Sequence, residues 1–488
     1  MLDLLFAFAK WRNPVAIAPP PSLAVPDATM EGGFAALQDM LRSNLMAPVG
    51  RMSKPWVRPA PKFPAAYLWD SAFIAFAWKW WDPQVAIDSL QPFVDFQDPA
   101  TGRMPHLVLL GRFTSKLSNP PFLAWAVDAV HEHLDDGALV DGYLQPLLHF
   151  IEFRKRHRFN RDHGLYFWID SYESGIDNSP RFRSADEKED YGVKHLGAVD
   201  LNAEIVLQHQ AVLSLAVKLG KEDEPWVIEA REERDRLAAA IETKLWDPKE
   251  EIFGDLDFHT GKMKTIDTIA SYFPLVIDGL GQDKIASLVS RLEDPAKYNT
   301  LVPLPSVARD SPGFTKDMWR GPVWLNTAYL VVKGLDQQGY GELAGKLAFK
   351  LAKGVYETWK NDGNFYEFYD PDRHDLVELN RKKGNLYKKI TLGSKPVKNF
   401  AGWTALANTL LIEHVIGLRR SGRTWSIAPH LPPAWMEQNK QTTITLPAHR
   451  FSVNVQPGGD GEIIHVIGTR DGEKITADVV NHDRAVLE

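Results

Sequence analysis

Apolar residues recur every three to four positions over most of the chain between residues 34 and 419, the spacing that puts them on one face of an α-helix. Polar and charged residues fill the positions between them. This periodicity predicts twelve helices, at residues 34–44, 70–82, 83–97, 120–134, 141–157, 199–219, 225–245, 267–279, 283–293, 321–336, 340–359 and 401–419.

The predicted helices differ in how much of their circumference is apolar. Five are apolar on most sides, as buried helices are, at residues 70–82, 120–134, 199–219, 321–336 and 401–419. Their neighbours along the chain are more amphipathic; residues 229–236, for instance, are mostly charged. We therefore expect an inner and an outer ring of helices with short connections, which is an all-α (α/α)6 barrel. A two-domain helical array is the alternative.

The pattern changes to alternating apolar and polar residues near the C-terminus, which is typical of β-strands. Strands are predicted at 442–446, 451–455 and 463–467, with glycine-rich turns at 457–461 and 471–472. Near the N-terminus, a proline-rich stretch predicts an extended conformation. The predicted domains are an extended lead-in (1–30), the catalytic barrel (31–421) and a small β-rich C-terminal appendage (422–488).

Composition limits the chemistry that the chain can perform. Its 488 residues include no cysteine, which excludes thiolate catalysis and cysteine-ligated metal centres. The net charge of −7 gives no broad positive field to attract nucleic acid or an anionic membrane. The apolar stretch Leu4–Ala9 is shorter than a signal-peptide core and lacks a basic leader. We expect a cytoplasmic protein with neither nucleic acid nor membrane as partner; the oligomeric state is left open.

Tryptophan is unusually frequent, with 16 residues, and four of them (Trp69, Trp319, Trp324 and Trp403) lie in segments near the starts of helices expected in the inner ring. In a ring of helical hairpins these N-termini share one face, so the segments would meet in one funnel. Aromatic rings, carboxylates, amides and guanidinium groups together are the side chains that bind a sugar. The segments are 67–70, 118–121, 173–181, 199–202, 317–324, 364–370 and 399–403.

Two acidic residues of these segments are candidates for catalysis. Asp177 lies in a loop between Gly175 and Pro180, and Glu367 lies between aromatic residues. An acid among aromatic rings is desolvated, which raises its pKa as a general acid requires. Glycoside hydrolysis needs two carboxyl groups, one to protonate the leaving oxygen and one to activate water or attack carbon. The pair therefore predicts a glycoside hydrolase.

Five strings in these segments resemble those of glycoside hydrolase family 63. They are Trp69–Phe73, Glu173–Arg181 (ESGIDNSPR), Arg320–Trp324, Asn364–Tyr369 and Phe400–Thr404. The family includes processing α-glucosidases and bacterial mannosylglycerate and glucosylglycerate hydrolases, and the trehalases are relatives. The resemblance runs from about Tyr67 to Leu418 and implies an inverting α-glycosidase on an (α/α)6 barrel. The chain lacks the large N-terminal β domain of the processing glucosidases, so the resemblance favours the members that act on a small α-glucoside or α-mannoside.

The resemblance also assigns roles to residues. It implies that Asp177 is the general acid and Glu367 the general base, and that Trp69, Asp70 and Phe73 bind the non-reducing sugar. Tyr172 stands where tryptophan is expected in glycerate-specific members. No metal ligand and no required cofactor are predicted, and a structural Ca²⁺ is left open. The expected substrate-binding residues are Tyr67, Trp69, Asp70, Phe73, Tyr172, Gly175, Asn178, Arg181, Trp319, Arg320, Trp324, Tyr369 and Trp403.

The sequence leaves several roles undecided. Arg181 either braces the loop of the acid or contacts substrate, and Asp200 and Asn202 either cap a helix or face the funnel. The loop from Ser184 to His195 is either a mobile flap over bound sugar or a solvated segment without function. An anionic aglycone such as glycerate would need a cation, for which the candidates are Arg181, Arg309, Lys316 and Arg320.

Two other functions compete with hydrolysis. A sugar epimerase on a similar barrel would use histidine pairs, and His106, His195 and His209 are the histidines near the funnel segments. A sugar-binding protein without catalysis is the other alternative, which the presence of both Asp177 and Glu367 disfavours.

Overall fold

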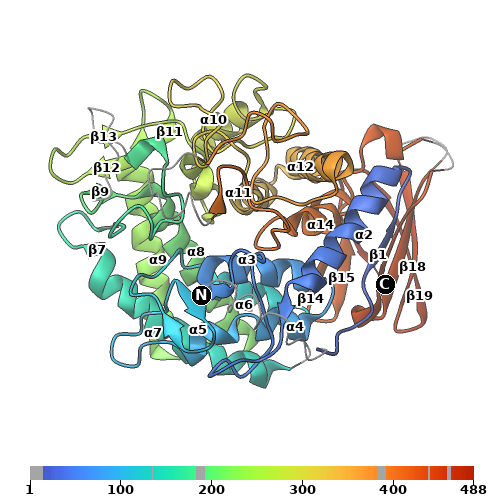
Figure 1. Cartoon of the computed structure of the whole chain (residues 1–488), viewed down its shortest axis with the longest axis horizontal. Helices are drawn as coiled ribbons and strands as arrows, with labels where there is room; N and C mark the ends of the chain where they lie inside the picture. The colour runs from blue at the N-terminus through green and yellow to red at the C-terminus, as the bar shows by residue number, and fades with distance from the viewer. Residues whose placement is uncertain are drawn as a thin grey trace.

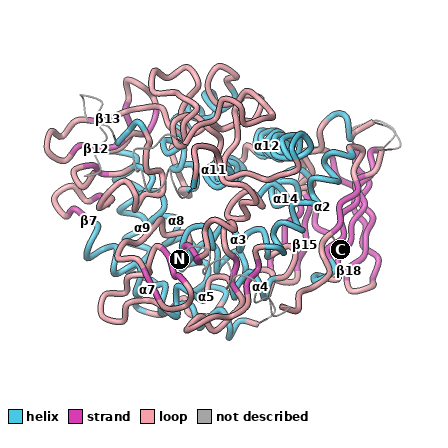
Figure 2. Tube along the Cα trace, viewed as in Figure 1, coloured by secondary structure: helices cyan, strands magenta, loops and turns pink. Residues whose placement is uncertain are grey.

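The computed structural model describes residues 15–134, 136–182, 193–381, 392–437, 440–458 and 463–487. Up to about residue 416 the long regular elements of the described chain are helices, joined by loops that contain short strands. Beyond Leu418 it is mostly β-sheet, which lies at one side of the helical part (Figure 1, Figure 2).

The predicted helical segments are helical in the structure, and several match within two residues. The α-helices are α2 (Ala28–Ser43), α3 (Leu68–Trp78), α4 (Pro83–Asp88), α5 (Gln91–Asp95), α6 (Leu123–His131), α7 (Gly137–Arg158), α8 (Val199–Lys218), α9 (Pro225–Lys244), α10 (Gln282–Glu293), α11 (Leu325–Gln337), α12 (Gly341–Asp362) and α14 (Leu406–Leu410).

Three predicted helices differ in detail. Range 83–97 splits into α4 and α5, because Pro92 has no N–H to donate and its ring would clash with the carbonyl of Asp88. Range 267–279 contains the 3₁₀-helix η2 (Ile269–Val276) instead of an α-helix, and Pro274 lies inside it. Range 401–419 holds the short α14, which continues as the π-helical turn η3 (Leu411–Val415).

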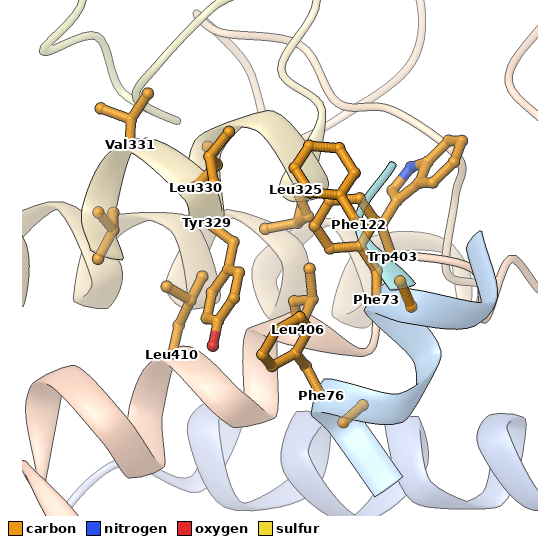
Figure 3. Packing of buried hydrophobic residues seen from close by; sticks show 14 of the residues in the cluster. Phe73, Phe76, Phe122, Leu325, Tyr329, Leu330, Val331, Trp403, Leu406 and Leu410 are labelled. Atoms are coloured by element: carbon orange, nitrogen blue, oxygen red, sulfur yellow. The ribbon is translucent and has the colours of Figure 1, made fainter. Parts of the chain in front are cut away.

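Six helical segments contact one another in a closed cycle. Helix α3 packs against α6, α6 against α8, α8 against η2, η2 against α11, α11 against α14, and α14 against α3. Every residue of α3 is buried, as its apolar sequence predicts. The interior of the cycle is packed with side chains that include Phe73, Phe76, Phe122, Leu325, Tyr329, Leu406 and Leu410 (Figure 3).

The remaining long helices pack against this cycle or against one another. Helix α7 contacts α6 and α8, α9 contacts α8, and α12 contacts α11 and α2. Helix α9 buries few of its residues, whereas its partner α8 buries most, which agrees with the difference in their apolar patterns. Among the described residues, no helix combines the length and the apolar character needed to cross a bilayer.

The C-terminal part holds a five-stranded antiparallel sheet with the order β1-β16-β17-β18-β19. Its strands β16 (Thr442–Leu446), β17 (Phe451–Pro457) and β18 (Ile463–Arg470) begin at the predicted residues, and β19 (Glu473–Val480) follows the turn at Asp471 and Gly472. Strand β1 (Ser22–Ala24) of the N-terminal lead-in pairs with β16, so the lead-in forms an edge of this sheet. The strands β14 (Leu418–Ser421), β15 (Thr424–Ile427) and β20 (Ala485–Leu487) form a smaller sheet.

Candidate active site

Trp69, at the start of α3, has neighbours from three other predicted segments: 173–181, 317–324 and 399–403. The centroid of its ring lies 6.0 Å from that of Trp319 and 5.5 Å from that of Trp403. Gly175 lies against the same ring, and a β-carbon at Gly175 would come within 2.6 Å of it. Gly175 also has a φ of +72°, so both its backbone and its surroundings require glycine. The loop of Asp177 is thereby packed onto Trp69.

The loop of Asp177 is anchored by an ion pair at each end. At its start, the buried Glu173 pairs with Arg154 at 3.2 Å and with Arg158 at 2.8 Å, both from α7. Burial opposes ionisation of Glu173, but the two guanidinium groups hold its pKa below the usual value. At the end of the loop, Arg181 forms the second anchor with Asp200 and Asp255. Asp177 itself is half-buried between the anchors.

Arg181 forms the second anchor of the loop, and its contacts bear on whether it braces the loop or binds substrate. Its guanidinium pairs with Asp200, at the start of α8, and with Asp255 at 2.8 Å. Arg181 is 2% exposed, so its charge is neutralised inside the protein. These contacts fit bracing of the loop. Asn202 likewise serves the backbone: its amide accepts from the N–H of Tyr166 at 2.8 Å and donates to the carbonyl of Ala198 at 2.7 Å.

Asn178, the residue after the acid, ties this loop to the segment of Trp319. Its amide donates to the carbonyl of Asp317 at 3.2 Å and accepts from the N–H of Trp319 at 2.9 Å. The ring of Trp319 stacks on Trp324 at 3.8 Å between centroids. Trp324 in turn stacks on Phe368 at 4.6 Å, next to Glu367. A continuous set of rings and hydrogen bonds therefore connects the segment of the acid to that of the base.

Glu367 is held by its own backbone and by residues 397–403. Its N–H donates to the carbonyl of Val397 at 3.0 Å, and the N–H of Val397 donates to its carboxylate at 3.3 Å. The indole of Trp403 donates to the carbonyl of Glu367 at 2.6 Å. The side chain is 5% exposed. The carboxylate of Glu367 is therefore held in position beside residues 397–403.

Arg381 is a buried cation that interacts with both candidate acids. Its guanidinium forms an ion pair with the carboxylate of Glu367. Burial lowers the pKa of Arg381 to about 10, and the negative charges of Asp177 and Asp317 act in the opposite direction. Glu367 thus pairs with a buried cation on which the charge of Asp177, far away in the sequence, also acts. Sequence reasoning missed Arg381, because it lies outside every aromatic or glycine-rich string.

Asp70 is the predicted sugar-binding carboxylate. It lies in the first turn of α3, 5% exposed, and a β-carbon at Gly402 would come within 2.8 Å of its Oδ1. Burial raises the pKa of Asp70 to about 8, although hydrogen bonds to its own N–H and to Trp69 act against this. The side chain therefore carries a proton at pH 7 and can donate as well as accept a hydrogen bond.

The raised pKa of Asp70 predicts a pH-dependent stability. Between about pH 4 and pH 8 the native carboxyl keeps a proton that the unfolded chain has lost, so the free energy of unfolding falls as the pH rises. From pH 5 to pH 8 we expect the wild type to lose about 2–4 kcal/mol more than Asp70→Asn does. Urea unfolding of the ligand-free proteins at both pH values measures this difference, and equal losses would contradict the raised pKa.

A sequence model of the mannosylglycerate hydrolase MGH1-like glycoside hydrolase domain matches residues 63–387, which include all the segments up to Arg381. The chain belongs to this glycoside hydrolase family. A mannosylglycerate hydrolase of Thermus thermophilus is 27% identical over 384 residues, covering 63% of this chain and 89% of the relative. The glucosylglycerate hydrolase of Mycolicibacterium hassiacum is 23% identical over 399 residues, covering 63% and 87%.

A solved structure shows the same fold as this MGH1-like hydrolase. It is the GH63 mannosylglycerate hydrolase from another strain of Thermus thermophilus, in complex with glucose, with a TM-score of 0.63 and 23% identity. The match covers 77% of this chain and 99% of that chain. The resemblance to glycoside hydrolase family 63 is therefore confirmed. Membership supports hydrolysis over the epimerase and binding-protein alternatives.

The other predicted substrate-binding residues of this MGH1-like hydrolase differ in exposure. Tyr67, Tyr172 and Arg320 are half-buried. Phe73, Trp324 and Tyr369 are buried, each at most 1% exposed. The hydroxyl of Tyr369 accepts from the N–H of Tyr366 at 3.0 Å. The half-buried residues therefore have surface to offer a ligand, whereas the buried ones have almost none.

Besides Arg181, two more candidate cations for an anionic aglycone are engaged by carboxylates. Lys316 Nζ lies 2.7 Å from Asp370 and 2.6 Å from Glu378, and Arg309 lies 3.0 Å from Asp372. Of the predicted flap at 184–195, residues 184–192 lie outside the described residues. Within the part of the chain that the structure describes, no three histidine, aspartate or glutamate side chains gather as metal ligands would.

Proposed function

We propose that the chain hydrolyses the α-glycosidic bond of a small glycoside with inversion, and that the closed cycle of six helical segments is the inner ring of an (α/α)6 barrel. The observation that carries the proposal is the buried Arg381, which forms an ion pair with Glu367 and whose charge interacts with that of Asp177. Two carboxyl groups at one site are the minimum that glycoside hydrolysis needs.

Each acid has one task in this mechanism. Asp177 donates its proton to the glycosidic oxygen, so the aglycone leaves as a neutral alcohol. Glu367 takes a proton from a water that attacks the anomeric carbon from the opposite face. The bond from the anomeric carbon to the aglycone breaks as the bond to water forms. Inversion requires the two carboxyl groups to lie about 6.5–9.5 Å apart, which leaves room for that water.

The sugar would contact the residues around Trp69. Aromatic rings match the apolar C–H face of a pyranose; Trp69 lies against the loop of the acid, and Trp403 lies beside Trp69. The neutral Asp70 would pair with sugar hydroxyls beside them. Tyr67, Tyr172 and Arg320 would border the sugar or its aglycone. Phe73, Trp324 and Tyr369 would support these side chains from behind, and Arg181 would brace the loop of the acid.

The names of the relatives favour an α-mannoside or α-glucoside of glycerate as substrate. The test is hexose release from a panel of trehalose, kojibiose, glucosylglycerol, glucosylglycerate and mannosylglycerate. We expect one of the glycerate glycosides to be hydrolysed fastest. Release from trehalose alone would contradict the glycerate assignment, and release from none of the five would contradict the proposed function.

Inversion predicts the anomer that appears first. An α-glycoside attacked by water from the opposite face yields the β-sugar, which then mutarotates slowly. A proton NMR time course, recorded within the first minutes on whichever glycoside the panel identifies, should therefore show the β-anomer first. If the α-anomer appears first instead, the enzyme retains configuration and Glu367 is a nucleophile.

A further inference from the structure

Arg381 is a buried cation that the mechanism above does not yet use. It is 4% exposed, and its backbone is fixed on both sides: its N–H donates to the carbonyl of Ser394 at 2.8 Å, and the N–H of Met318 donates to the carbonyl of Asn380 at 3.1 Å. The ion pairs of Lys316 with Asp370 and Glu378 hold the same two segments together. The guanidinium is thereby held in one place.

The charges of three carboxylates, each from a different segment, act on this guanidinium. Glu367 forms the ion pair, and Asp177 and Asp317 interact with it through space. A further described neighbour is the ring of Phe368, 5.6 Å from the guanidinium carbon. The Nε and Nη2 atoms of Arg381 are buried, and neither has a partner with ordinary hydrogen-bond geometry among the described residues, although Nη2 forms the ion pair with Glu367. Arg381 therefore interacts with the acids through its charge. Its Nε makes no structural hydrogen bond within the described chain.

The proposed hydrolysis moves one negative charge between these carboxylates. Before reaction Glu367 is ionised and Asp177 carries the proton; afterwards Glu367 carries a proton and Asp177 is ionised. The two acids therefore hold one negative charge at the start and one at the end. A fixed cation that faces both acids compensates this charge wherever it resides.

We propose that Arg381 is the counter-ion of the catalytic pair, a positioning residue that holds the Glu367 carboxylate and offsets the charge that passes from Glu367 to Asp177. This inference rests on the proposed function. A residue that only braced the site would leave the pKa values of the two acids unchanged, whereas a counter-ion lowers both pKa values. Without the cation, ionisation of both acids is disfavoured, so both titrate at higher pH.

The experiment is the pH profile of kcat/KM, which reports the free enzyme, for the wild type and for Arg381→Gln. We expect both limbs of the bell-shaped profile to move to higher pH in Arg381→Gln by about one unit or more. The maximum should fall by at least about 10²-fold. Arg381→Lys keeps the charge, so its limbs should stay near those of the wild type even if the maximum falls.

The matched control is Arg373→Gln. Arg373 lies in the same segment after Glu367, 44% exposed, and pairs with Asp375 at 2.6 Å. Its removal should leave both limbs in place. Limbs that do not move in Arg381→Gln, or that move equally in Arg373→Gln, would overturn the counter-ion role.

A second measurement separates this proposal from the proposed function. If no glycoside is hydrolysed by the wild type, the proposed function fails; the charge coupling of Arg381 with Glu367, on which the counter-ion role depends, is tested independently by the melting temperatures of Glu367→Gln, Arg381→Gln and the double variant. Coupled charges predict that the double variant loses less than the two single losses combined. Additive losses would overturn the role, and the same comparison applies if Arg381→Gln proves too unstable for kinetics.

Discussion

Asp177→Asn and Glu367→Gln are each expected to lower turnover by at least about 10²-fold while the protein keeps its fold. Asparagine at 177 cannot donate the acidic proton that the leaving oxygen needs, and glutamine at 367 cannot take a proton from water. Both substitutions preserve the size of the side chain. Turnover on the best glycoside of the panel measures the loss, and circular dichroism checks the fold.

Asp375→Asn is the control for this pair of variants. Asp375 lies a few residues after Glu367, is partly exposed, and pairs with Arg373. Its turnover should stay within about twofold of the wild type, because surface ion pairs contribute little. Turnover at the level of the wild type in Glu367→Gln would show that another group activates the water. The same result in Asp177→Asn would remove the assigned acid.

Glu173→Gln is expected to cost about 3–5 kcal/mol in the free energy of unfolding, the usual cost of breaking a buried ion pair from one side. Glu173 and Arg154 are completely buried, and Arg158 is nearly so. Removing the carboxylate charge leaves two guanidinium groups without their partner inside the protein. Turnover should fall as well, because Glu173 anchors the loop that carries Asp177.

Glu152→Gln is the matched control for Glu173→Gln. Glu152 pairs with Arg156 on the same helix α7 at 2.6 Å, but both side chains are exposed. Its loss should cost less than about 1 kcal/mol. Urea unfolding at pH 7 measures both variants. A cost for Glu173→Gln as small as that for Glu152→Gln would mean that the ion pairs at Arg154 and Arg158 do not hold the loop.

The sequence predicts the long elements well because their periodicity is strong. Helices α8, α9 and α12 begin within a residue of their predicted starts, and strand β16 matches at both ends. The misses have local causes that a helical period does not reveal. Pro92 divides α4 from α5, Pro274 lies in a 3₁₀ turn, and the last helix begins only at Leu406 because the residues before it form the loop of Trp403.

The candidate site was predictable as far as its residues belong to recognisable strings. Asp177, Glu367, Trp69 and Asp70 are all contained in them. The sequence does not reveal which charged side chains form ion pairs with one another. Arg381 has no neighbouring motif, and its partners come from three other segments. Ion pairs between distant segments depend on the fold, so a single sequence gives no signal for them.

The pairing of Asp177 with Glu367 across one bound sugar can be tested directly by a crystal structure of Glu367→Gln with the glycoside that the panel identifies. The substrate should lie against Trp69, with its glycosidic oxygen in hydrogen-bond reach of Asp177 and the residue 367 side chain on the opposite face. The two side-chain ends should lie about 6.5–9.5 Å apart. A glycoside bound elsewhere, or one contacted by Asp177 with residue 367 out of reach of the anomeric carbon, would contradict the assignment.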